Sequence, residues 1–313
     1  MYVIRFSPVR VVEFATPQEF DARAKRWLTI REAENTYLLA TLATLTKQVA
    51  GPRAANGDGR IAARLFVIED AGAVVAAGTL STAGDLAVTW ATQEMIDVLA
   101  DHAVQAGWTL RSVYGPEHVA WNVAYAYAKQ SGKRVEAGKA ERIYQLARAR
   151  YQLPPGRLEL ATAADRALLR PWFHHFAQEV ALEASTAEVD TSMDALLAER
   201  LLYLWKAPEA VSMAAWVAPT SQGATMSYVY TPPEHRGHGH GKAVVAALGA
   251  HMLGRGLKFC FIHTDVRDTR SNHVYQAIGA NAVCEVLRCT LHPLAEGARA
   301  MAGARGNGSG RLG

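Results

Sequence analysis

Residues 230–242 read Tyr-Thr-Pro-Pro-Glu-His-Arg-Gly-His-Gly-His-Gly-Lys. A strand-like apolar run leads into this segment, and a helical pattern leaves it with Val244, Leu248 and Met252 spaced four residues apart. A glycine-rich turn between a strand and a helix leaves backbone N–H groups free at the positive end of the helix dipole. The segment therefore predicts an anion-binding turn within an α/β domain.

Two common phosphate-binding patterns do not fit this turn. A Walker A loop would need a glycine at Arg236 and a hydroxyl at Ala243. A dinucleotide-binding turn needs the spacing G-x-G-x-x-G, whereas Gly237, Gly239 and Gly241 lie two residues apart. A tight turn that binds no ligand stays open as an alternative.

The pattern Arg236-x-x-Gly239-x-Gly241 resembles the pyrophosphate-binding loop of the GNAT acetyltransferases, which bind acetyl-CoA. A second element has the spacing of that family, because a strand over 259–264 is followed by Ser271-Asn272-His-Val-Tyr275. In the family an Asn of this late segment contacts the cofactor, and a Tyr lies near the thioester sulfur. The resemblance is specific over residues 224–291, and the order of elements agrees back to residue 157.

The resemblance implies direct transfer of an acetyl group from acetyl-CoA to an amine. Tyr275 would protonate the leaving thiolate, although a core aromatic is the alternative interpretation of this residue. The strand over 226–231 would part from its neighbour, and its backbone at Val229 would meet the cofactor. The residues that the resemblance assigns to cofactor binding are Val229, Tyr230, Thr231, Arg236, Gly237, His238, Gly239, His240, Gly241, Lys242, Asn272 and Tyr275.

The general base has two candidates. Glu179 and Glu183 lie four residues apart and share a face of a predicted helix, where they could bind or deprotonate a cationic amine. A solvated helix face explains the same pair. His263, near the end of a strand, has a suitable pKa class, but a structural role is the alternative.

No metal is expected at this site. His235, His238 and His240 could form a cluster, but they lie in a loop without a nearby pair of carboxylates. The three cysteines contain no C-x-x-C pair, and their odd number argues against a disulfide framework. We interpret them as small buried apolar residues of a protein in a reducing cytoplasm.

The bulk composition excludes several classes of function. The chain has 313 residues, a formal net charge of +4, and basic residues that are scattered rather than clustered on a stripe. Nucleic-acid binding is therefore not expected as its main role. No apolar run reaches the roughly 20 residues needed to cross a bilayer, and the N-terminus lacks the pattern of a signal peptide. We expect a cytoplasmic protein that does not bind membranes.

The chain reads twice in a similar order, with Tyr-Gln-Leu-Pro-Pro-Gly at residues 151–156 as the best boundary. In the second half the patterns predict helices over 164–182 and 192–202 and strands over 212–219 and 224–231. At the place of the glycine loop the first half reads Leu-Ala-Val-Thr-Trp-Ala-Thr over 86–92, with neither Arg nor Gly.

Two GNAT-like domains are therefore expected, each with a mixed, largely antiparallel sheet flanked by helices. Residues 1–150 would form a degenerate domain without a cofactor loop. Residues 151–293 would form the catalytic domain, and residues 294–313 a flexible tail rich in Gly, Ala and Arg.

The resulting functional hypothesis is an N-acetyltransferase that uses acetyl-CoA and no metal, and acts as a monomer or homodimer on a primary amine of a small molecule or amino acid. A non-catalytic acyl-CoA sensor or scaffold, and a protein N-acetyltransferase, are the alternatives. The family often has Asn where Asp268 stands and an aromatic residue where Ala280 stands. The first departure bears on the cofactor or acceptor pocket, and the second on packing behind the site.

Overall fold

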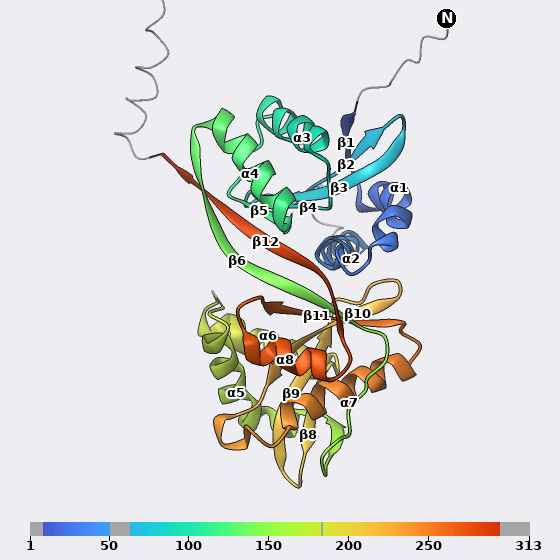
Figure 1. Cartoon of the computed structure of the whole chain (residues 1–313), viewed down its shortest axis with the longest axis vertical. Helices are drawn as coiled ribbons and strands as arrows, with labels where there is room; N and C mark the ends of the chain where they lie inside the picture. The colour runs from blue at the N-terminus through green and yellow to red at the C-terminus, as the bar shows by residue number, and fades with distance from the viewer. Residues whose placement is uncertain (1–8, 51–62, 183, 295–313) are drawn as a thin grey trace, which may run out of the picture. The chain divides into compact units, whose positions relative to one another are not determined.

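The computed structural model describes residues 9–50, 63–182 and 184–294 and divides the chain into two compact units. Unit 1 comprises residues 1–140 and 285–313, and unit 2 comprises residues 141–284. Each unit has a mixed, largely antiparallel sheet flanked by helices, which confirms the predicted fold class (Figure 1). No helix of the described residues is long and apolar enough to cross a membrane.

In unit 1, helices α3 (Gln93–Gln105) and α4 (Glu117–Ser131) pack against one face of the sheet. Trp108 and Phe66, whose ring centroids lie 5.2 Å apart, belong to the buried core under these helices. Its strands follow the order β1-β2-β3-β4-β5-β12-β6, and only β4 and β5 pair in parallel among the pairs recorded there. The elements are β1 (Arg10–Phe14), α1 (Pro17–Ile30), α2 (Thr36–Ala50), β2 (Ala63–Asp70), β3 (Ala73–Ser81), β4 (Asp85–Val88), α3 (Gln93–Gln105), β5 (Ser112–Pro116), α4 (Glu117–Ser131) and parts of β6 (Lys133–Leu146) and β12 (Asn281–Pro293).

Unit 2 has a separate core on each face of its sheet. Val244 and Leu248 of α7 are buried in the core on one face, whereas Leu169 and Phe173 of α5 are buried in the core on the other. The strands follow the order β6-β11-β10-β9-β8-β7, with β10 parallel to β11. The elements are β7 (Arg157–Leu160), α5 (Arg166–Glu179), α6 (Thr186–Ala198), β8 (Leu202–Lys206), β9 (Ala210–Val217), β10 (Gly223–Tyr230), α7 (His240–Gly254), β11 (Phe259–Asp265) and α8 (Thr269–Ala277).

Two strands serve both units. β6 has 14 residues, of which 133–140 belong to unit 1 and 141–146 to unit 2. β12 has 13 residues, and its part from residue 285 onward belongs to unit 1. The units therefore do not coincide with the expected domains 1–150 and 151–293, and the expected tail lies outside the described residues from residue 295 onward.

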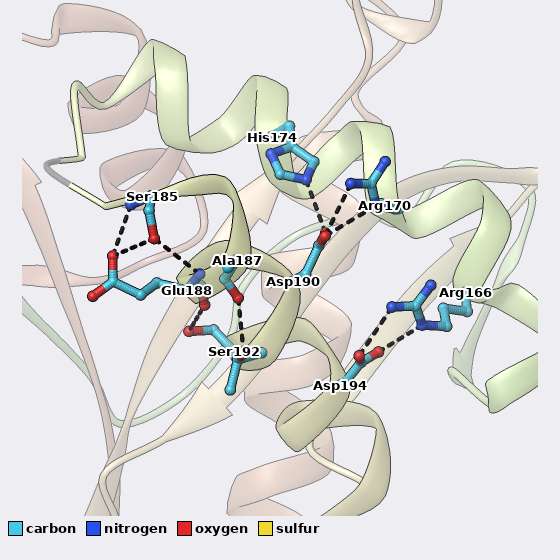
Figure 2. A network of polar contacts seen from close by, with 10 residues as sticks. Arg166, Arg170, His174, Ser185, Ala187, Glu188, Asp190, Ser192 and Asp194 are labelled. Carbon is cyan, nitrogen blue, oxygen red and sulfur yellow. Dashed lines mark hydrogen bonds and ion pairs between the residues drawn. The ribbon is translucent and has the colours of Figure 1, made fainter.

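Ion pairs connect helices α5 and α6, and a capping box begins α6 (Figure 2). Arg166 makes two hydrogen bonds to Asp194, at 2.7 and 2.9 Å, and Asp190 accepts hydrogen bonds from Arg170 and His174. The Arg170 side chain, and then that of His174, hold the pKa of Asp190 below its usual range. Because these pairs are largely exposed, they contribute little to stability, although they link α5 to α6.

One predicted helix in this unit was wrong in its bounds, and one strand was missed. The helix expected over 192–202 starts at Thr186, where Ser185 forms a capping box with Glu188, and it ends at Ala198. Residues 202–206 instead form β8, whose side chains are almost all buried. A short continuous apolar run is compatible with either a helix or a buried strand, so its periodicity could not separate the two.

Replacing Ser185 by Ala tests the α6 cap. The Ser185 hydroxyl accepts a hydrogen bond from the Glu188 N–H at the helix start, and its loss should lower the free energy of unfolding by about 1 kcal/mol. Ser192 lies inside the same helix and donates only to the Glu188 carbonyl, so Ser192→Ala should change stability by less than about 0.5 kcal/mol. Urea unfolding followed by circular dichroism measures both variants, and equal losses would contradict the assignment of the cap.

Candidate active site

The glycine-rich segment forms an open turn at the start of α7. A short 3₁₀ turn at Pro233–His235 follows β10, and the chain then passes through Gly237 and Gly239 at φ angles of 84° and 80°. Only glycine adopts such angles without strain, so both positions require it. Gly239 is the N-cap of α7 and supplies no side-chain cap. The first amides of α7 are therefore available to an anion.

The neighbouring strands separate beside this turn. Parallel pairing between β10 and β11 ends at Met226 and Ile262, whereas β11 continues to pair with β6 as far as Asp265. β10 carries an irregularity between Ser227 and Tyr230, where Tyr228 has a φ angle of 52°. In the described part of the chain, β10 forms no pair with β11 after Met226. Their backbone groups are therefore open to a ligand.

A cavity of about 830 Å³ connects the turn with the separated strands. This volume is within the range of roughly 300–1,000 Å³ typical of small-molecule sites. Among the predicted site residues, those that line it are Glu179, Val229, Tyr230, Thr231, Arg236, Gly237, His238, Gly239, His240, Gly241, Lys242 and Tyr275. Asn272 and His263 do not line it. The sequence analysis assigned no site role to Tyr151, Arg270, Ser271 or Val274, which contribute to the walls of the cavity.

Arg236 points toward the α5 side of the cavity. Its Nη2 lies 2.5 Å from Glu179 Oε1, and its Nε donates to the Thr231 carbonyl at 2.8 Å. The guanidinium carbon also lies 5.6 Å from the centre of the Tyr230 ring. The side chain thus ties the turn to α5, whereas the resemblance assigned it to cofactor binding.

The other end of the cavity carries cations and histidines. Lys242 and Arg270 line it, and the rings of His238 and His240 stack with centroids 5.8 Å apart. Burial, together with the neighbouring histidines, holds the pKa of His240 below its usual value. No group of three His, Cys, Asp or Glu side chains suited to a metal ion occurs in the described part of the chain.

Tyr275 presents a buried phenol to the cavity from α8. Its side chain is 6% exposed and is packed in the core between α7 and the sheet. Burial and the nearby charge of Asp268 raise the pKa of Tyr275, while a hydrogen bond with Ser271 acts in the opposite direction. The phenol therefore stays protonated at neutral pH and can donate a proton.

Asp268 and Asn272 have structural partners at the start of the same helix. Asp268 caps α8 by accepting from the N–H groups of Arg270 and Ser271, which an Asn could also do. The Asn272 amide donates to the carbonyls of Asp265 and Asp268, and its oxygen accepts two side-chain hydrogen bonds from β6. All four of its hydrogen-bonding positions are used. The amide has no capacity left for the cofactor contact expected from the resemblance.

The two candidate bases lie in different places. Glu179 lines the cavity with 49% of its side chain exposed, and Glu183 lies outside the described residues. On β11, Cys260 and Ile262 belong to the core beneath α7, so His263 projects to the opposite face of the sheet. Burial lowers the pKa of His263 to about 4, which makes it a weak base.

The corresponding region of unit 1 is closed. The Thr92 hydroxyl accepts from the Met95 N–H and so caps α3 from within the chain. A Cβ on Gly115 of β5 would lie 2.4 Å from the Val88 carbonyl oxygen of β4, so the two strands approach closely there. At this position the described residues of unit 1 therefore show neither an uncapped helix start, since α3 is capped, nor a separation of β4 from β5 at Gly115.

Comparison with known proteins places these features in context. Residues 204–289 match the family model described as FR47-like protein. A Drosophila protein of known structure is similar at 12% identity and a TM-score of 0.61, with 91% of this chain and 99% of that chain covered. A GCN5-related N-acetyltransferase from Sphaerobacter thermophilus is similar at 15% identity and a TM-score of 0.57, with 91% and 96% covered. These likenesses establish the fold. No curated protein sequence matches the chain.

The partly buried His263 gives a testable pH dependence. Its pKa is about 4 in the folded chain against 6.5 for the free side chain, so between these values the unfolded chain binds a proton that the folded chain does not. The free energy of unfolding should therefore fall by about 1–3 kcal/mol as the pH drops through this window. In His263→Gln this part of the pH dependence should vanish, whereas replacing the exposed His118 should leave it in place. Urea titrations between pH 7 and pH 4 measure it, and parallel curves for wild type and His263→Gln would contradict the assignment.

Proposed function

We propose that this chain is an N-acetyltransferase of the GNAT superfamily, and its fold and its FR47-like segment support the proposal. The acetyl group would pass from acetyl-CoA to a primary amine of a small molecule or amino acid by direct attack. The observation that carries the proposal is one cavity that joins an uncapped helix N-terminus, a strand opening and a buried protonated phenol. The first can bind the phosphates of the cofactor, the second can polarise the thioester carbonyl, and the third can protonate the leaving thiolate.

The residues at the α7 end fit the pyrophosphate of acetyl-CoA. The amides of the turn and the helix dipole attract a phosphate, and a side chain at Gly237 or Gly239 would hinder its approach. Lys242 and Arg270 add positive charge to the same end. The first unit offers no such site in its equivalent turn, so we expect one acetyl-CoA per chain.

The reaction uses the other two groups. The amine nitrogen forms a bond to the acetyl carbon while the carbon–sulfur bond breaks, so the amine loses a proton and the thiolate gains one. Backbone N–H groups near Val229, exposed where β10 leaves β11, are suited to polarise the acetyl carbonyl. Tyr275 is suited to protonate the thiolate, because it is buried and keeps its proton at neutral pH.

Glu179 is the stronger of the two candidate bases. It lines the cavity beside Tyr230, whereas His263 does not line the cavity and its lowered pKa makes it a weak base. Without an acceptor it pairs with Arg236, and a cationic amine can compete for the same carboxylate. A carboxylate so placed would draw a protonated amine into the cavity and then accept its proton.

A charge placed at Gly237 tests cofactor binding. A Cβ there would meet no atom within 4 Å, and Asp and Asn tolerate its positive φ angle better than other side chains do. Gly237→Asp should weaken acetyl-CoA binding by at least about tenfold relative to Gly237→Asn, because only the first adds a negative charge beside the phosphate. Calorimetric titration measures both, with wild type expected to bind one acetyl-CoA per chain. No binding by wild type would refute the proposal, and two per chain would refute the closed site of unit 1.

Removing the hydroxyl of Tyr275 separates a catalytic role from cofactor binding alone. In Tyr275→Phe the ring packing stays, so the Kd for acetyl-CoA should be unchanged while kcat falls by about 10²–10⁴-fold through loss of the proton donor. Thiol release in a screen of amino acids, amines and peptides measures the activity. If the chain binds acetyl-CoA but transfers to no acceptor, the non-catalytic sensor is correct, and transfer to peptide N-termini alone would identify a protein N-acetyltransferase.

A further inference from the structure

Strand β6 brings two side chains from the N-terminal half of the chain to the helix that carries Tyr275. Its residues 141–146 belong to unit 2 and pair antiparallel with β11, from Glu141 opposite Asp265 to Leu146 opposite Cys260. Arg142 and Tyr144 alternate with Ile143 and therefore lie on the same face of the strand. Tyr144 is fully buried in the core that also contains Tyr275.

Both side chains bind the same atom of Asn272. The Tyr144 hydroxyl donates to Asn272 Oδ1 at 2.8 Å, and Arg142 Nη1 donates to it at 3.1 Å. The amide nitrogen donates to the carbonyls of Asp265 and Asp268 at 2.9 and 2.7 Å. Asn272 is 7% exposed, so these bonds are shielded from water and joined into one network.

The network fixes the position of Tyr275 along and around α8. Asn272 lies three residues, or about one helical turn, before Tyr275 on the same side of the helix. Gln276, the next residue after Tyr275, donates to the Tyr144 hydroxyl at 3.3 Å. The rings of Tyr144 and Tyr275 are also in contact, with centroids 5.7 Å apart and an angle of 54° between the planes. Tyr144 thus contacts α8 at three residues, Asn272, Tyr275 and Gln276.

We propose that Tyr144 and Arg142 are positioning residues, which hold the Tyr275 phenol in its catalytic place through Asn272. The proposal rests on the proposed function, since it assigns Tyr275 the role of proton donor. It also gives the N-terminal half a part in the chemistry of unit 2. That half supplies the strand that completes the sheet beside β11 and sets the proton donor, although its own turn is closed to the cofactor.

Tyr144→Phe tests the proposal with little disturbance of the core, because Asn272 keeps its bond to Arg142. We expect kcat to fall about tenfold, in line with the cost of a small misplacement of a catalytic group, with the Kd for acetyl-CoA unchanged. Tyr127→Phe is the matched control. Tyr127 is a buried tyrosine of unit 1 whose hydroxyl donates to the Trp108 carbonyl at 2.6 Å, so its loss should lower stability and leave kcat unchanged.

A double-mutant cycle separates positioning from a general loss of stability. If Tyr144 acts through Tyr275, then Tyr144→Phe should lower kcat about tenfold in wild type and should have no further effect in Tyr275→Phe. A merely structural role would give equal, multiplicative effects in both backgrounds. An unchanged kcat in Tyr144→Phe, or an equal fall in Tyr127→Phe, would overturn the proposal.

A spectroscopic measurement tests whether Tyr144 positions Tyr275 even if no acceptor is found. Protein labelled with ¹³Cζ-tyrosine gives one ring signal per tyrosine, and Tyr275→Phe identifies the signal of Tyr275. We expect Tyr144→Phe to shift that signal and Tyr127→Phe to leave it in place. A Tyr275 signal that is unchanged in Tyr144→Phe would refute the positioning role. Failure to bind acetyl-CoA would refute the proposed function and leave this result unaffected.

Discussion

The separation of β10 from β11 after Met226 is the constraint on which the site depends. A buried strand that leaves its partner exposes backbone N–H and C=O groups, which cost free energy unless something else binds them. The structure limits that cost on both sides, because β11 stays paired with β6 to Asp265 and β10 returns to β9 at Tyr230. The opening is therefore confined to a few residues, and it lies between an open helix N-terminus and the phenol of Tyr275. A ligand that supplies hydrogen bonds there completes the sheet.

The parts of this site that the sequence predicts are those encoded over short distances. The glycines of the turn, the helix that follows and Tyr275 on its own helix can all be found from local spacing, because turn angles and helix periodicity are local properties. The contacts of Arg236 with Glu179 and of Asn272 with Tyr144 join residues 57 and 128 positions apart. No local pattern encodes such pairs, so the sequence could not reveal these partners of Arg236 and Asn272, whose roles in cofactor binding stay predictions from the resemblance. The strand over Leu202–Lys206 was missed for a similar reason, because its conformation depends on burial within the sheet and not on local periodicity.

The same order of elements has different consequences in the two units. Where unit 2 has Gly239 without a side-chain cap, unit 1 has Thr92, whose hydroxyl satisfies the helix start from within the chain. Where unit 2 opens its parallel strands, unit 1 brings them together at Gly115. The cap on α3 satisfies a backbone N–H from within the chain, whereas the start of α7 leaves its first amides open to a ligand. The two units thus differ in how their equivalent helix starts are satisfied.

The strands β6 and β12 make the two units depend on each other for complete sheets. Each strand begins in one unit and ends in the other, so a cut at the Pro-Pro-Gly segment near residue 155 would not release two complete sheets. Unit 2 without residues 141–146 would lose the strand beside β11 and, with it, two partners of Asn272. The opening beside Met226 can be tolerated only because β11 is held on its other edge. The N-terminal half therefore contributes to the site through β6, the strand that pairs with β11.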